Sequence, residues 1–124
     1  VRSEESISEG LEDLEGLRTA AAHVDVRPSA EGFGDLALAL DLLGSIESAE
    51  ATLHCALERR ESRGSHQRSD HPDTEPSQVV NYVVELNDQG RQEVTRHEVP
   101  DVPEYLSDKL DSYKELEIEG RLLE

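Results

Sequence analysis

The sequence predicts an α+β fold, with a helical N-terminal half, then a β-hairpin and a C-terminal helix for which a third strand is the alternative. Before residue 60, apolar residues recur every three or four positions in two stretches, the spacing of helices with one apolar face. Residues 61–78 contain no large apolar side chain, and from residue 80 the period changes to two, as in a strand. We therefore expect a helical region 1–60, a flexible polar loop 61–78, and a hairpin with its C-terminal element 79–124, together forming one domain.

The first helix is predicted over residues 1–22. Ser6 and Glu9 match the capping-box pattern, in which a hydroxyl and a carboxylate bind the free N–H groups at a helix start. One apolar stripe follows, made of Ile7, Leu11, Leu14, Leu17 and Ala21. Residues 23–28 alternate briefly and stop at Pro28, which favours a short edge strand or an extended connector.

The helical pattern returns over residues 35–60. In the middle of this stretch, Gly44 could end one helix and Ser45 could cap the next. The pattern therefore fits either one long helix or two shorter ones, 35–43 and 46–60, and we favour the two.

The hairpin has the clearest pattern in the chain. Val80, Tyr82, Val84 and Leu86 fall on one strand face, residues 87–90 have the composition of a turn, and 91–99 return as a second strand. Further on, Pro103 suits the first position of a helix. The last stretch, 115–123, fits either a strand or the continuation of that helix.

The charge balance is strongly acidic. Lys and Arg total 12 and Asp and Glu total 29, which gives a formal net charge of −17. Such a composition is typical of cytoplasmic proteins from extreme halophiles, because at molar salt the screening length falls to about 3 Å and an acidic surface no longer repels itself. No apolar run is long enough to span a membrane, and the N-terminus lacks the pattern of a signal peptide. We therefore expect a salt-adapted cytoplasmic protein.

The sequence offers no convincing catalytic or metal-binding residues. His66, Asp70, His71 and Asp73 share the polar loop, but a flexible loop loses too much entropy when it fixes a metal geometry. The one cysteine, Cys55, excludes an internal disulfide and has no histidine placed to activate it. Glycine-rich phosphate loops and nucleophile elbows are absent as well. We therefore expect no cofactor, no metal and no enzymatic activity.

The predicted element order, helix, short strand, two helices, hairpin and helix, resembles the winged helix-turn-helix fold of prokaryotic regulators. The resemblance implies a reading helix over 45–60 and a wing over 79–99. It also implies phosphate contacts by Arg59, Arg60, Arg63, Arg68, Arg91 and Arg96. Glu47, Glu50 and Glu58 on the implied reading helix argue against it, because base edges are read mainly by Arg, Asn and Gln.

The favoured interpretation is a small, acidic, non-enzymatic interaction protein that forms a homodimer. A small core with several half-apolar elements suggests that a partner completes their burial. The expected dimer contact is the C-terminal apolar set Leu106, Leu110, Tyr113, Leu116 and Ile118. The alternative is a winged helix-turn-helix DNA-binding transcriptional regulator. The arginines discriminate between the two: DNA binding needs them on one open surface, whereas an interaction protein would pair them with neighbouring acids.

Overall fold

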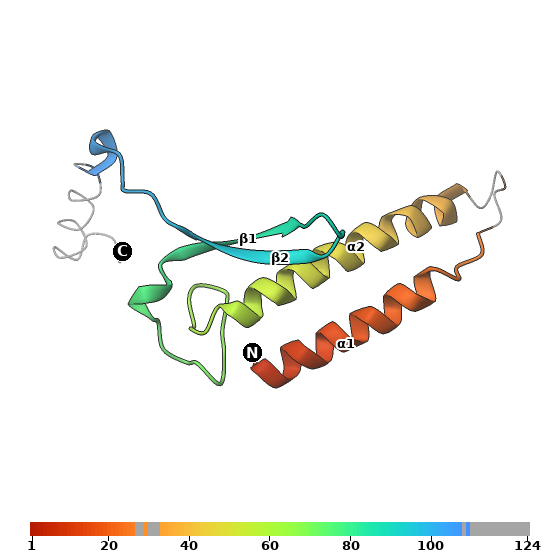
Figure 1. Ribbon diagram of the computed structural model, residues 1–124, viewed down its shortest axis with the longest axis horizontal. Coiled ribbons are helices and arrows are strands. Elements are labelled where there is room, and N and C mark those ends of the chain that lie inside the picture. Colours follow the sequence, from red (N-terminus) through yellow and green to blue (C-terminus); the bar gives the residue numbers. More distant parts are fainter. Residues whose placement is uncertain (27–28, 30–32, 108, 110–124) are drawn as a thin grey trace, which may run out of the picture.

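Two long helices lie side by side, and a two-stranded antiparallel sheet crosses the second of them (Figure 1). This computed structural model describes residues 1–26, 29, 33–107 and 109. The elements are α1 (Glu4–Ala21), α2 (Phe33–Glu58), the 3-10 turn η1 (Pro76–Gln78), β1 (Val80–Leu86) and β2 (Gln92–Glu98). The predicted α+β architecture of helices followed by a hairpin is confirmed.

Helix α1 begins at a reciprocal pair of hydroxyl caps. The Ser3 hydroxyl accepts a bond from the Ser6 backbone N–H at 3.2 Å, and the Ser6 hydroxyl accepts one from the Ser3 N–H at 2.9 Å. The cap therefore lies one turn earlier than the predicted Ser6–Glu9 box. Ser6 acts as the third helical residue of the motif, because its short hydroxyl reaches back to the cap as a Glu would.

Helix α2 is one continuous helix, so the predicted break at Gly44 and Ser45 is wrong. The Ser48 hydroxyl donates to the Gly44 carbonyl at 2.8 Å, one helical turn away. Gly44 faces open space, where a glycine costs about 1 kcal/mol relative to alanine. Burial of Ile46, which is 3% exposed, follows directly after it and favours the unbroken helix.

The segment after α1 forms no strand in its described part, so of the two alternatives predicted for 23–28, residues 24–26 do not form the edge strand. The Val24 N–H instead bonds the Ala21 carbonyl at 3.2 Å and extends the helix end by a turn. Residues 27–28 lie outside the described residues.

The hairpin has the predicted strands and turn. Val80 pairs with Glu98 and Val84 with Val94, in antiparallel register. In the turn, the Asn87 side-chain oxygen accepts the Arg91 N–H at 2.9 Å, and Gly90 takes a left-handed φ of 72°. Glycine suits that position because a Cβ there is strained.

The core lies where the hairpin and α1 meet the C-terminal half of α2. Its buried apolar residues are Ile7, Ile46, Ala56 and Val80. Half-buried Cys55 points its sulfur at the Tyr82 carbonyl, at 3.9 Å, and burial raises the pKa of its thiol. A thiol held protonated in this way is a poor nucleophile.

The C-terminal element begins as a helical turn over 104–107. The Leu106 N–H bonds the Pro103 carbonyl at 2.8 Å, and the Leu106 side chain is 37% exposed. The other expected dimer residues, Leu110, Tyr113, Leu116 and Ile118, lie outside the described residues, as does the choice between strand and helix over 115–123. Within the described ranges, no helix is both long and apolar enough to cross a bilayer.

Candidate functional site

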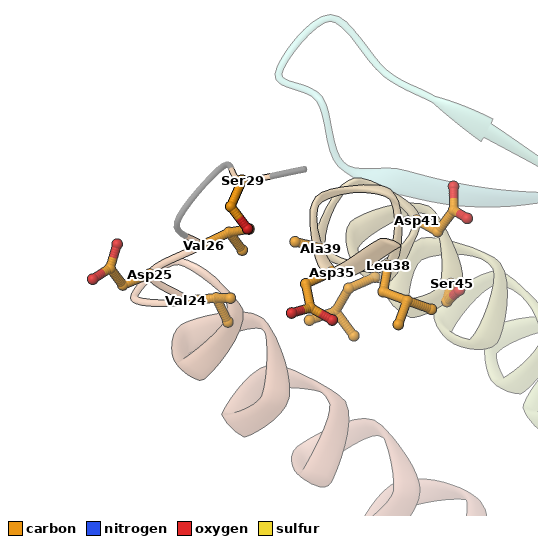
Figure 2. Close-up of a pocket in the computed structure, with 10 residues that line it drawn as sticks. Val24, Asp25, Val26, Ser29, Asp35, Leu38, Ala39, Asp41 and Ser45 are labelled. Atoms are coloured by element: carbon orange, nitrogen blue, oxygen red, sulfur yellow. The ribbon is translucent and has the colours of Figure 1, made fainter. Parts of the chain in front are cut away.

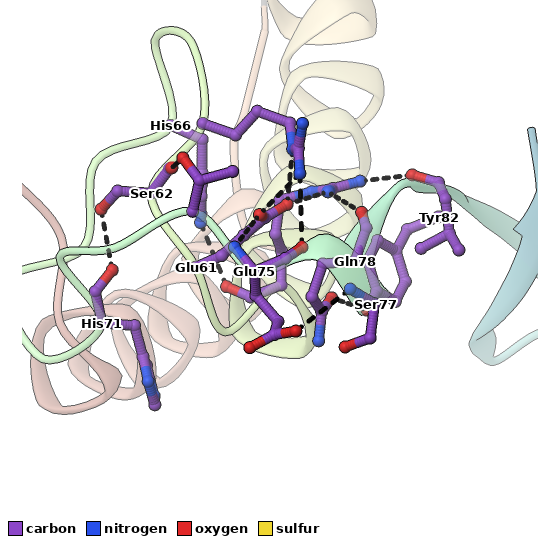
Figure 3. Close-up of polar contacts among 12 residues, drawn as sticks. Glu61, Ser62, His66, His71, Glu75, Ser77, Gln78 and Tyr82 are labelled. Atoms are coloured by element: carbon purple, nitrogen blue, oxygen red, sulfur yellow. Dashed lines mark hydrogen bonds and ion pairs between the residues drawn. The ribbon is translucent and has the colours of Figure 1, made fainter.

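Residues 59–75, here called the arginine loop, connect α2 to η1, and three of their side chains are buried in a network of hydrogen bonds and ion pairs (Figure 3). Glu61 is fully buried, Arg68 is 1% exposed and Ser62 is 6% exposed. The expectation of a flexible polar loop over 61–78 is therefore corrected. Charged side chains can be buried when each is paired and its remaining polar atoms are hydrogen-bonded, and this loop meets that condition.

Glu61 is the centre of one half of the loop. Its carboxylate accepts bonds from Arg59 Nη1 at 2.7 Å, from Arg63 Nε and Nη2 at 2.8 and 3.0 Å, and from the Glu75 N–H at 2.9 Å. The bonds from Arg63 lower the pKa of Glu61 most, to about 2, with help from the Glu75 N–H and Arg59. The carboxylate thus stays ionised although it is buried.

Arg59 connects the end of α2 to the start of β1. Besides Glu61, its guanidinium donates to the Gln78 carbonyl at 2.9 Å and to the Val80 carbonyl at 2.6 Å. The same group lies over the Tyr82 ring, 4.9 Å from the centroid. One planar group therefore bonds three acceptors and stacks on an aromatic face, a combination available to Arg and not to Lys.

Arg68 and Asp70 form the other half of the loop, between the ends of the two helices. Arg68 Nη1 donates to the Ala56 carbonyl at 2.8 Å, near the C-terminus of α2. Asp70 Oδ2 accepts the Glu4 N–H at 2.8 Å, at the N-terminus of α1. Each charge therefore lies at the helix end whose dipole it complements. Pairing with Arg68 holds the pKa of Asp70 far below its usual range.

Ser62 and a tight turn complete the loop. The Ser62 hydroxyl donates to the His71 carbonyl at 2.8 Å and accepts the Arg68 N–H at 2.9 Å. Gly64, with a φ of 56°, makes the turn between Arg63 and His66. Burial lowers the pKa of His66, whose Nε2 lies 3.2 Å from the Arg59 carbonyl, so the imidazole is neutral at pH 7 and donates to that carbonyl.

The six arginines proposed for DNA contact do not form an open cationic surface. Arg59, Arg63 and Arg68 are bound to Glu61 and Asp70. Arg60 is exposed beside them. The other two are on the hairpin, where Arg91 is exposed at the turn and Arg96 donates to the Ser77 carbonyl at 2.7 Å. Three of the six arginines are therefore paired with neighbouring acids, and such pairing argues against DNA binding.

The four side chains weighed as metal ligands are also dispersed. Asp70 is paired with Arg68, and His66 bonds a carbonyl, as described above. In the described part of the chain, no three His, Cys, Asp or Glu side chains are grouped so as to hold a metal ion.

A second feature is an open groove of about 1070 Å³ at the end of the helix pair opposite the arginine loop, where α1 ends and α2 begins (Figure 2). Val24 and Val26 line it from beyond α1, and Asp35, Leu38 and Leu42 line it from the first turns of α2. Its walls are aliphatic with carboxylates, and the part of the groove formed by α2 contains no cation.

The arginine loop was missed from the sequence, although a signal was present. Arg59, Glu61 and Arg63 alternate in charge at every second residue, and Arg68 and Asp70 repeat the spacing. In an extended segment, side chains two apart lie on the same side. Alternation of opposite charges therefore predicts pairing within the segment, whereas the lack of large apolar side chains, considered alone, predicts a flexible polar loop.

Comparisons with known proteins agree on one family. A family model described as the fumarate reductase flavoprotein C-terminal region matches residues 1–113. The chain is 30% identical over 84 residues to the succinate dehydrogenase flavoprotein subunit of Rickettsia bellii, covering 67% of this chain and 14% of that protein. It is 33% identical over 79 residues to the fumarate reductase flavoprotein subunit of Proteus vulgaris, covering 63% of this chain and 13% of that protein.

Solved structures show the same fold. An E. coli quinol fumarate reductase superposes with a TM-score of 0.71 at 21% identity, over 82% of this chain and 18% of that one. The Mycobacterium smegmatis Sdh1 complex gives a TM-score of 0.69 at 28% identity, with the same coverage. The chain thus spans about one seventh of the curated relatives it matches.

These matches overturn the function inferred from composition. The salt-adapted, non-enzymatic, homodimeric interaction protein and the DNA-binding regulator are both wrong, because the matched family consists of parts of oxidoreductase flavoproteins. The winged-helix resemblance is wrong for the same reason: the structural relatives are flavoprotein domains. It rested on element order, and in the described residues neither a short strand after α1 nor a break in α2 is present.

Proposed function

Because this chain belongs to the family of fumarate reductase flavoprotein C-terminal domains, we propose that it serves as that domain in a flavoprotein that interconverts fumarate and succinate. The match of the family model over residues 1–113 carries this proposal. The names of the relatives, a succinate dehydrogenase and a fumarate reductase flavoprotein subunit, supply the reaction. The small share of each relative that the chain covers means that the activity belongs to a larger assembly.

A flavin does not fit the described residues by themselves. The guanidinium groups of Arg59, Arg63 and Arg68 are bound to carboxylates and backbone carbonyls. Among the described side chains, the buried polar atom without a partner is Gln92 Oε1, a single acceptor on the hairpin. The groove carries Asp35 and Asp41, which would repel the phosphates of a flavin nucleotide. We therefore assign flavin binding to another part of the assembly.

The same reasoning applies to the dicarboxylate substrate. Two substrate carboxylates need cations or N–H donors that are not already occupied. Glu61 and Asp70 occupy the guanidinium groups of Arg59, Arg63 and Arg68, and the exposed Arg60 and Arg91 lie on separate elements. This domain therefore contributes a scaffold, in which the loop fixes α1, α2 and the hairpin relative to one another. A protein partner is consistent with the relatives named as subunits and as a complex.

The proposal is tested on the polypeptide that carries this sequence in its source cell, isolated through a C-terminal affinity tag. Visible absorbance reports bound flavin, and dye-linked assays report succinate oxidation and fumarate reduction. We expect bound flavin and at least one of the two activities. A polypeptide with neither would overturn the proposal.

A matched pair of variants tests the scaffold role on the same preparation. Arg68→Met removes a buried guanidinium, and Arg60→Met removes an exposed one with the same change in net charge. We expect Arg68→Met to lower the temperature at which flavin is released and Arg60→Met to leave it unchanged. Equal effects of the two variants would contradict the scaffold role.

A further inference from the structure

The N-terminal half of α2 exposes a set of leucines, here called the apolar shoulder: Leu38, Leu40, Leu42 and Leu43. They are 69%, 70%, 36% and 48% exposed. A helix that is apolar nearly all round is ordinarily buried on all sides. Exposed apolar patches of this kind mark surfaces that contact another protein part.

The shoulder is bare because the other elements do not extend to it. Gly10 of α1 lies against Leu53, and Arg18 pairs with Glu50, so the helices are antiparallel. Helix α1 has 18 residues and α2 has 26. Helix α2 is therefore longer by eight residues, which span about 12 Å of helix. The hairpin contacts α2 at Glu47, whose carbonyl accepts Gln92 Nε2 at 2.9 Å. Within the described residues, burial on α2 begins at Ile46.

Charge on this part of α2 restricts what can cover the shoulder. Residues 33–58 contain no Lys or Arg, whereas Asp35 precedes the leucines and Asp41 lies among them. A second copy would bring the same carboxylates and another net charge of −17. An anionic membrane surface would add further negative charge. A covering segment with aliphatic side chains and flanking Lys or Arg is complementary to the shoulder, because its aliphatic side chains match the leucines and its cations match the carboxylates.

We propose that the apolar shoulder docks against the remainder of the same flavoprotein, through a segment that combines aliphatic and basic side chains. The inference rests on the proposed function, under which most of the polypeptide lies outside this chain, as the 13–18% coverage of the relatives indicates. The groove beside Leu38 and Leu42 gives that segment a concave seat.

Cysteine labelling in the intact polypeptide tests the docking. In a Cys55→Ser background, Leu40→Cys and Leu43→Cys report on the shoulder, and Leu86→Cys is the control at a residue of matched type and exposure, 66% against 70% for Leu40. We expect maleimide to modify both shoulder cysteines at least about tenfold more slowly in the native polypeptide than in urea. We expect Leu86→Cys, outside the shoulder, to react near its urea rate. Modification of both shoulder cysteines at the urea rate would overturn the proposal.

Two further measurements separate the possible outcomes. The polypeptide is diluted until sedimentation equilibrium shows that it is monomeric, and the maleimide rates are measured again. Loss of protection in the monomer would identify a second copy as the cover and overturn the proposal. Flavin content and succinate–fumarate activity are measured on the unmodified polypeptide. If the polypeptide is active but its shoulder cysteines are not protected from maleimide, the docking is contradicted and the proposed function is not. If the shoulder cysteines are protected but the polypeptide has neither flavin nor activity, the proposed function is contradicted and the docking is not.

Discussion

Arg68 and Asp70 pair through two guanidinium nitrogens and both oxygens of one carboxylate, at 2.8 and 2.7 Å, and each also bonds the backbone of a different helix. Arg68 donates to the Ala56 carbonyl of α2, and Asp70 accepts the Glu4 N–H of α1. A loop that separates α2 from the hairpin therefore also fixes the start of α1.

We expect Arg68→Met to destabilise the 124-residue chain by roughly 3 kcal/mol, because removal of one partner leaves Asp70 and the Ala56 carbonyl without their donor. Arg60→Met, with the same change in charge at an exposed residue, should change stability by less than about 0.5 kcal/mol. Urea unfolding followed by circular dichroism measures both. Similar midpoints for the two variants would show that the bonds of buried Arg68 do not stabilise the fold.

Acid should destabilise the chain in a defined window. The folded pKa of Glu61 is about 2, below its ordinary value of 4.5, so its contribution is complete above pH 4.5 and is lost as the pH falls towards 2. Glu61→Gln removes this titration, and its stability should fall less steeply across that window than that of the unmodified chain. Urea midpoints at a series of pH values give the two slopes. Parallel slopes would exclude Glu61 as a source of the acid sensitivity.

Arg59→Lys should loosen the hairpin from α2. An ammonium group cannot reach Glu61 and the Gln78 and Val80 carbonyls together, and it loses the planar stacking on Tyr82. We expect faster amide hydrogen exchange in β1, with α1 little changed. Arg60→Lys is the neighbouring control and should leave exchange in β1 unaltered.

The two glycines of α1 should respond differently to alanine. A Cβ at Gly16 meets nothing within 4 Å, so Gly16→Ala should stabilise the chain by about 0.5–1 kcal/mol through helix propensity. At Gly10 the added Cβ lies 3.1 Å from Leu53 Cδ1, and the leucine must shift. Gly10→Ala should therefore gain less than Gly16→Ala in thermal unfolding. An equal gain would mean that the helix contact at Leu53 is loose.

Trypsin should spare the arginine loop. A flexible loop over 61–78, as the sequence predicts, would be cut first after Arg63 or Arg68, but both side chains are paired and the Arg68 N–H is bonded to Ser62. We now expect early cuts elsewhere, with the bonds after Arg63 and Arg68 cleaved only after unfolding. Mass spectrometry of early fragments decides this, and a first cut after Arg68 would contradict the packed loop.

Much of the fold could be predicted because its elements follow local rules. The spacing of Ile7, Leu11 and Leu14 predicted α1, and alternation from Val80 predicted β1. The continuity of α2 at Gly44 could not be read locally, since a glycine and a serine fit a helix end as well as an exposed turn. Burial of Ile46 against other elements decided it.

The sequence by itself determined the two helices, the hairpin with its turn, and the strongly acidic charge, because period, turn chemistry and composition depend on neighbouring residues. Only the tertiary structure decided which distant backbone groups the charges of the arginine loop bind. Glu4 and Asp70 are 66 residues apart, yet a carboxylate of one bonds the backbone of the other. Pairing over that distance depends on the path of the whole chain. Arg68, which in the sequence suggests a solvated loop or a DNA contact, therefore becomes a buried tie between α2 and, through Asp70, the start of α1.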